Sequence, residues 1–174
     1  LGCPVCATRY PVRAGVVDFT VGAPRPSGQA AEQGMALRAA ALLGLTEPGG
    51  LVVLAGAWAA CADELLGMVD GVQLLALDFA PGTESGGALS LARIANVLPL
   101  AAGCARGIAL DLEHSTESLL GGAATALAPG GRLIAPALAP VPPMLRELAR
   151  DERHWVAARN TENVSAPVRI APRR

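Results

Sequence analysis

The sequence predicts an α/β protein built on a mostly parallel β-sheet. Strand-like and helix-like segments alternate from about residue 31 onward, which is the pattern of such folds. The strand-like segments are continuous apolar runs, as expected for strands that are covered on both faces. Two of these runs end on an aspartate, Asp78 and Asp111. Because ligands of open α/β sheets bind beyond the carboxyl ends of the strands, both aspartates are candidate site residues.

The expected elements follow from apolar runs and from the Gly and Pro breaks between them. In chain order they are a helix over Glu32–Leu43, a strand over Leu51–Ala55, a helix over Ala59–Met68, a strand over Val72–Leu77, a helix over Ala88–Ile94, a short strand over Ala95–Leu98, a strand over Gly107–Leu110, a helix from Ser115 or Thr116 to Ala128, a turn at Pro129-Gly130-Gly131, a strand over Arg132–Ala135, a helix over Met144–Arg153, and a terminal hairpin of Trp155–Arg159 and Pro167–Ile170.

The N-terminal residues differ in character from the rest. Residues 1–21 begin with Cys3-x-x-Cys6, a cysteine knuckle, and continue with two short extended pieces around a turn near Gly15. Residues 22–30 are rich in Pro, Gly and Ser and predict a linker. The expected organisation is therefore a short segment over 1–21, a linker over 22–30 and an α/β domain over 31–174.

Composition excludes several classes of function. The net charge is −1, which argues against a nucleic-acid-binding surface. No apolar run reaches the roughly 18 residues that would indicate a transmembrane helix. The N-terminus carries no signal-peptide pattern, so a reducing cytoplasmic location is expected. In that compartment the four cysteines are expected to be buried or to bind metal.

From about Glu32 to Ile170 the chain resembles the class I S-adenosylmethionine-dependent methyltransferases. The resemblance rests on four segments, Val52-Val53-Leu54-Ala55-Gly56, Leu77-Asp78, Leu98–Gly103 leading into Gly107–Asp111, and Leu127-Ala128-Pro129-Gly130-Gly131-Arg132-Leu133-Ile134. It implies a Rossmann-like sheet with strand order 3-2-1-4-5-7-6 and an antiparallel strand in the final hairpin.

The N-terminal segment resembles the zinc-ribbon modules that are fused to methyltransferases or activate them. In such modules a second cysteine knuckle precedes a segment like Tyr10-Pro11-Val12-Arg13-Ala14-Gly15-Val16. The resemblance makes Cys3 and Cys6 the second knuckle. A structural zinc needs four ligands, so zinc is expected only with ligands from outside this chain.

The resemblance also implies a cofactor site, and the sequence departs from it. Small residues in the turn after the first strand let the cofactor lie against the backbone, but Trp58 stands two positions after Gly56. Asp78 takes the place of the acidic residue that binds the ribose hydroxyls, and Leu98 opens the segment that leads to the fourth strand. Binding of S-adenosylmethionine is therefore expected to be weak or absent. In that case the turn that contains Gly56 and Trp58 is a packed structural loop.

Asp111 and His114 are the candidate catalytic residues. A histidine beside carboxylates is suited to general-base chemistry, such as methyl transfer to oxygen or nitrogen. The alternative is that both lie in a solvated loop before a capped helix. The second histidine, His154, is expected at the surface.

Three functions remain open from the sequence. The first is a methyltransferase-like protein with a degenerate cofactor site that acts as a structural or regulatory partner, with another protein or as a homodimer. The second is a divergent but active S-adenosylmethionine-dependent methyltransferase. The third is a binding module for another small ligand.

Overall fold

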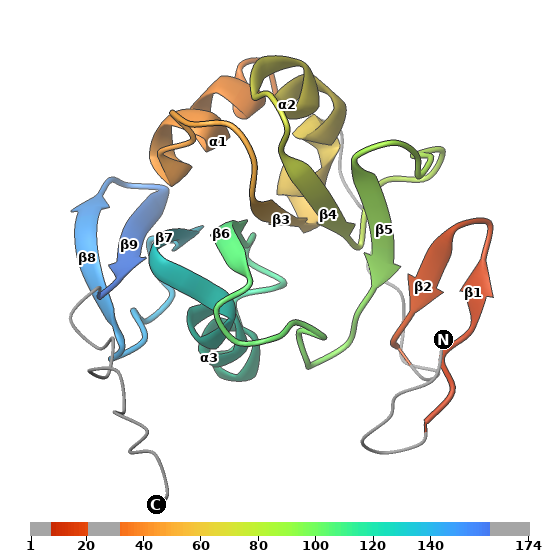
Figure 1. Ribbon diagram of the computed structural model, residues 1–174. Helices are drawn as coiled ribbons and strands as arrows, with labels where there is room; N and C mark the ends of the chain where they lie inside the picture. Colours follow the sequence, from red (N-terminus) through yellow and green to blue (C-terminus); the bar gives the residue numbers. More distant parts are fainter. Residues whose placement is uncertain (1–7, 21–31, 161–174) are drawn as a thin grey trace, which may run out of the picture.

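The part of the chain that the structure describes is centred on a nine-stranded mixed sheet (Figure 1). The computed structural model describes residues 8–20 and 32–160. Its strands are β1 Val12–Arg13, β2 Val16–Asp18, β3 Leu51–Ala55, β4 Gln73–Leu77, β5 Leu89–Arg93, β6 Ala105–Ala109, β7 Leu127–Pro136, β8 Leu145–Arg150 and β9 His154–Arg159. Its helices are α1 Met35–Leu43, the 3-10 helix η1 Gly56–Cys61, α2 Ala62–Met68 and α3 Glu117–Ala126.

The strand order confirms the Rossmann-like methyltransferase sheet. The order is β1-β2-β5-β4-β3-β6-β7-β9-β8, and its last seven members correspond to 3-2-1-4-5-7-6. Strands β5, β4, β3, β6 and β7 pair in parallel, whereas β9 is antiparallel to both β7 and β8. The hairpin β1–β2 extends this sheet, because β2 pairs in parallel with β5.

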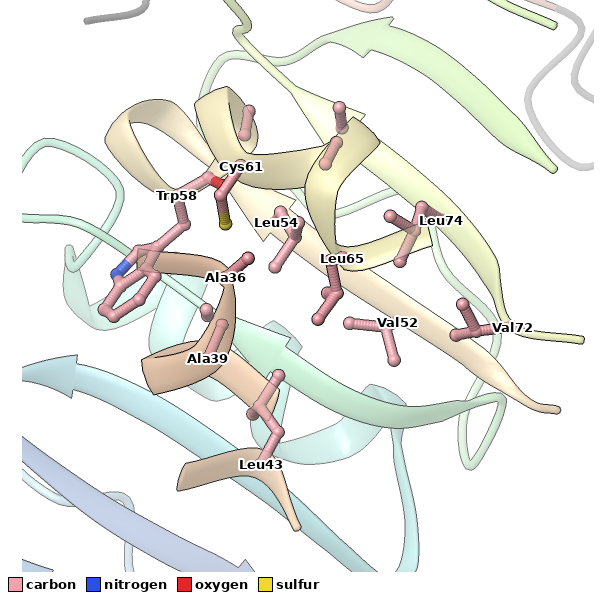
Figure 2. Close-up of a cluster of buried hydrophobic side chains, with 14 of the residues drawn as sticks. Ala36, Ala39, Leu43, Val52, Leu54, Trp58, Cys61, Leu65, Val72 and Leu74 are labelled. Atoms are coloured by element: carbon pink, nitrogen blue, oxygen red, sulfur yellow. The ribbon is translucent and has the colours of Figure 1, made fainter. Parts of the chain in front are cut away.

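Helices cover both faces of the sheet. Helices α1 and α2 lie on one face and α3 on the other (Figure 1). Each face buries its own hydrophobic cluster, the first containing Leu54, Trp58 and Leu65, and the second containing Ile108, Leu120 and Trp155. Figure 2 shows the first cluster, in which α1 supplies the small residues Ala36 and Ala39. Among the described residues, no helix is long and apolar enough to cross a bilayer.

The helix expected over Ala88–Ile94 is wrong, because Leu89–Arg93 forms strand β5. Leu89 and Leu91 are buried and Ser90 is exposed, which is the alternation of a strand. Leu91 pairs with Ala76 of β4 on one side and Val16 of β2 on the other. This pairing on both sides outweighs the local preference for a helix. The short strand expected over Ala95–Leu98 is a loop.

The helix expected over Met144–Arg153 is also wrong, because Leu145–Arg150 forms the edge strand β8. This segment is rich in residues with high helix propensity, but it pairs along its length with β9. A tight turn joins the two strands, since Asp151 accepts hydrogen bonds from the backbone N–H groups of Arg153 and His154. The hairpin partner of β9 is therefore β8. The predicted strand Pro167–Ile170 lies outside the described residues.

The turn expected at Pro129-Gly130-Gly131 lies inside β7, where the pairing with β6 shifts register. A Cβ atom on Gly131 would stand 2.9 Å from the backbone oxygens of Arg106 and Ala128. Glycine is therefore required at this position because the two strands approach closely there.

Candidate functional site

Two acidic strand ends and a histidine meet beyond the carboxyl ends of the parallel strands. Asp78 directly follows β4, and Asp111 lies two residues after β6. Strand β3 lies between β4 and β6, so the two aspartates flank its end. His114 lies in the loop between β6 and α3. The hydroxyl of Ser115 donates to the backbone oxygen of Asp111 at 2.6 Å and holds this loop against the strand end.

His114 bridges the two aspartates across the end of β3. Its Nε2 lies 2.8 Å from Oδ2 of Asp78, and its Nδ1 lies 2.6 Å from Oδ1 of Asp111. The histidine is 2% exposed and Asp78 is fully buried. The loop that was one alternative for His114 is therefore not solvated at this residue. We call Asp78, His114 and Asp111 the bridged triad.

The bridged triad fixes the charge of His114. Burial alone lowers the pKa of the imidazole, but the hydrogen bonds to Asp111 and Asp78 outweigh it and raise the pKa to about 9. Burial likewise raises the pKa of Asp111, and the hydrogen bonds from His114 and from the backbone of Ala57 reverse this and lower it. At neutral pH the imidazole is a cation between carboxylates. A cation cannot accept a proton, so this geometry does not suit His114 to general-base catalysis.

Both carboxylate oxygens of Asp78 are used inside the protein. Oδ2 contacts His114, and Oδ1 accepts a hydrogen bond from the backbone N–H of Ile94 at 3.3 Å. The backbone of Asp78 has φ +50°, in the left-handed region that residues with a side chain seldom adopt. Asp78 is fully buried as well, so ribose hydroxyls could reach these oxygens only if the atoms around them moved.

The turn after β3 is organised around Asp111. Gly56 has φ +59°, and a Cβ atom there would stand 1.9 Å from Oδ2 of Asp111. The same oxygen accepts a hydrogen bond from the backbone N–H of Ala57 at 2.8 Å. Gly56 is therefore needed for the close approach of an internal carboxylate, and one of the backbone donors at this turn is already satisfied.

Trp58 is part of the hydrophobic core. Its side chain is 3% exposed and belongs to the same hydrophobic cluster as Ala36 and Ala39 of α1 (Figure 2). The indole packs against the ring of His154, with ring centroids 5.3 Å apart. His154 was expected at the surface, but its ring is partly buried by this contact. The indole thus belongs to the core, and it is His114 that bridges the strand ends on either side of β3.

The remaining predicted residues do not join this cluster. Leu98 is 7% exposed and belongs to the second hydrophobic cluster, where it packs against Gly122 of α3. Cys3 and Cys6 lie outside the described residues. Within residues 8–20 and 32–160, no group of three or more His, Cys, Asp or Glu side chains is arranged to hold a metal ion.

A cavity of about 330 Å³ lies beside the bridged triad. It is bounded by the start of α1, the turn after β3, the loop after β6 and the junction between β8 and β9. Charged side chains at this cavity come from Glu32, Arg38, Asp111 and Arg153, and its aromatic side chains are Trp58 and His154. We call it the α1 cavity.

The sequence matches no protein-family model and no curated protein. A solved structure that shares the fold is a putative S-adenosyl-L-methionine-dependent methyltransferase of Methanococcus maripaludis, with a TM-score of 0.51 and 10% sequence identity over 74% of this chain and 84% of that one. The fold is that of a Rossmann-like methyltransferase. At this identity the likeness extends to the fold alone.

Two further structures are similar over shorter stretches. The complex of the Haloferax volcanii Trm112 methyltransferase activator with a putative methyltransferase gives a TM-score of 0.47 and 21% identity, covering 58% of this chain and 50% of that one. Geranyl diphosphate C-methyltransferase from Streptomyces coelicolor gives a TM-score of 0.47 and 16% identity, covering 60% and 43%. The chain matches half or less of the length of these two proteins.

Sequence reasoning found all three members of the bridged triad but missed their arrangement. In this methyltransferase fold, Asp78 and Asp111 end strands on either side of β3. The spacing of Asp111 and His114, three residues apart before a helix capped by Thr116, was the available signal that a short loop turns His114 back onto the strand ends.

Proposed function

We propose that this chain is a methyltransferase-like protein whose cofactor crevice is closed from within, and that it acts without catalysis as a structural or regulatory partner. The observation that carries the proposal is the hydrogen bonding of His114 to Asp78 and Asp111 across the end of β3. In open α/β sheets this is the place where ligands bind. Here an internal side chain occupies it.

The energetics support weak cofactor binding. A ribose that bound Asp78 would have to displace His114, and each hydrogen bond to a charged group contributes about 1.5–3 kcal/mol. Two such bonds together correspond to a loss of about two to four orders of magnitude in affinity. Displacement would also leave the His114 imidazolium without its contact to Asp78. A cofactor that would otherwise bind with a dissociation constant of about 1 μM would then bind with one of about 0.1–10 mM.

Calorimetric titration with S-adenosylmethionine and S-adenosylhomocysteine tests this proposal. We expect no binding tighter than about 0.1 mM, equivalent to roughly −5.5 kcal/mol. Because the indole of Trp58 fills the core rather than the crevice, Trp58→Gly is expected to lose stability without gaining affinity. His114→Ala, which frees Asp78, is expected to bind more tightly than either, provided circular dichroism shows that it is folded. Micromolar binding by the unchanged chain would instead favour an active methyltransferase.

We propose a protein partner or a second copy of the chain as the binding partner. Among the described strands, β1 and β8 form the two edges of the sheet and each has one unpaired side. Such edges are templates for strand addition by another chain. Light scattering separates the two options, because a homodimer would have about twice the chain mass of 17.6 kDa.

We propose a zinc site only if part of its ligands come from outside this chain. Cys3 and Cys6 supply two thiolate ligands, while a structural zinc takes four. The other two would come from residues beyond this chain or from a partner.

A further inference from the structure

We infer that the α1 cavity binds a small organic carboxylate with an apolar body. The inference rests on the proposed function, because it requires that the cavity beside the bridged triad is not taken up by S-adenosylmethionine. Its volume of about 330 Å³ lies at the lower end of the range for small-molecule sites.

One cation of the cavity has no ion-pair partner. Arg38 and Arg153 line the cavity as cations, and Glu32 and Asp111 line it as anions. Glu32 pairs with Arg153 at 3.4 Å, and Asp111 lies 2.6 Å from the His114 imidazolium, which it shares with Asp78. Among the described residues Arg38 has no such pair, so it is the cation that a carboxylate ligand would contact.

The guanidinium of Arg38 has N–H donors that can bind a ligand. This guanidinium makes no hydrogen bond or ion pair with any of the described residues, so its five N–H groups are open to a ligand. Asp151 is near enough for Arg38 to lower its pKa, but its Oδ1 already accepts from two backbone N–H groups. The planar fork of a guanidinium matches a carboxylate in bidentate geometry.

His154 adds a neutral donor. Burial lowers the pKa of its ring, so the ring is uncharged at neutral pH. Its Nδ1 is buried without a hydrogen-bond partner in the described part of the chain. A buried N–H without an acceptor is costly, so the proton belongs on Nε2. The ring, which lines the cavity, then offers Nε2–H to a bound acceptor.

The rest of the wall is apolar. Met35, Leu112 and Pro136 line the cavity together with the indole of Trp58. Donors grouped beside an apolar wall suit a ligand that has a carboxylate at one end and a hydrocarbon body at the other. A phosphate ion would meet the donors but leave the apolar wall unused.

The test is a titration followed by NMR with 3-phenylpropanoate as probe and its uncharged amide as the matched ligand. The indole N–H of Trp58 reports on the cavity, and that of Trp155, which donates to Ala139 inside the core, is the internal reference. We expect a dissociation constant of about 0.1–1 mM for the carboxylate. The Trp58 resonance is expected to shift while that of Trp155 stays fixed, and the amide is expected to bind at least tenfold more weakly.

Three arginine variants locate the site. Arg38→Gln is expected to weaken binding at least tenfold, and Arg153→Gln less, because Arg153 is already paired with Glu32. Arg146→Gln, on β8 and outside the cavity, is the control and is expected to leave binding unchanged. Equal loss in the Arg38 and Arg146 variants would overturn the inference, as would equal binding of the amide or of inorganic phosphate.

Different results would refute the carboxylate site and the closed cofactor crevice. No binding of 3-phenylpropanoate up to 10 mM, roughly tenfold above the weakest expected constant, would refute the carboxylate site while leaving the closed crevice intact. Micromolar binding of S-adenosylmethionine would refute the closed crevice, whatever the carboxylate does.

Discussion

His114 is the residue on which the closed crevice depends. It is buried, it carries a charge at neutral pH, and it shares that charge with two carboxylates that belong to different strand ends. Buried ion pairs contribute little net stability when complete, but removing one partner leaves a buried charge without compensation. The bridged triad is therefore a structural unit whose members depend on one another.

The charge of His114 predicts a pH dependence of stability. Its pKa is raised from about 6.5 to about 9 in the folded protein, so the stabilisation is complete below about pH 6.5 and is lost as the pH rises toward 9. The shift corresponds to at most about 3 kcal/mol in the free energy of unfolding. Urea unfolding at pH 6.5 and at pH 9 measures this loss.

The control for this prediction is His114→Gln, which keeps a hydrogen-bonding side chain but cannot be charged. We expect it to be less stable by about 3 kcal/mol at pH 6.5 and to lose the dependence between pH 6.5 and 9. Equal stability of the unchanged protein at both pH values would show that His114 is not a cation in the fold.

At the scale of elements, the turn from β3 into η1 is built around an internal carboxylate. Gly56 adopts φ +59° and leaves room for Asp111, whose oxygen then binds the backbone N–H of Ala57. A similar turn in a nucleotide-binding protein would use its small residues to admit a ligand. The same backbone feature here joins the loop after β6 to the loop after β3.

Gly56→Ala is expected to destabilise the fold by about 3 kcal/mol or more. The substitution forces a residue with a side chain into a left-handed conformation and places its Cβ against Asp111. The matched control is Gly121→Ala in α3, where no atom lies within 4 Å of the added Cβ and the position is exposed. That change is expected to stabilise the protein by about 0.5–1 kcal/mol. Thermal unfolding compares the two, and a Gly56→Ala variant as stable as the parent would contradict the role given to Asp111.

At the scale of the whole molecule, the N-terminal hairpin is continuous with the methyltransferase-like sheet. Strand β2 pairs with β5, the backbone N–H of Phe19 donates to the oxygen of Arg93 at 2.8 Å, and the rings of Phe19 and Tyr10 lie 4.7 Å apart. The hairpin adds two strands at the β5 side of the sheet.

Hydrogen exchange tests whether this continuity makes one cooperative unit. The amide of Phe19 is expected to exchange at a rate close to that of the amides in β5, because both open only when the edge of the sheet opens. The amide of Leu110, which donates to Ile134 in the sheet interior, sets the rate of global unfolding. Exchange at Phe19 as fast as in an isolated hairpin would show that β1 and β2 fold apart from the sheet.

The sequence by itself determined the sheet and the positions of its acidic strand ends. Buried parallel strands are continuous apolar runs, and β3, β4 and β6 could be predicted from them because burial on both faces leaves a local pattern. The places of Asp78 and Asp111 followed from where those runs stop. The strand order followed from the resemblance to the methyltransferases.

Only the tertiary structure decided the remainder. Strands β5 and β8 have local sequences that suit a helix, and pairing with neighbours distant in the chain made them strands. His114 contacts Asp78, 36 residues earlier, and no local pattern encodes that distance. Trp58 is buried in a hydrophobic cluster with Ala36 and Ala39 of α1, which belong to another segment of the chain. Each of these outcomes comes from packing between segments, which local periodicity does not record.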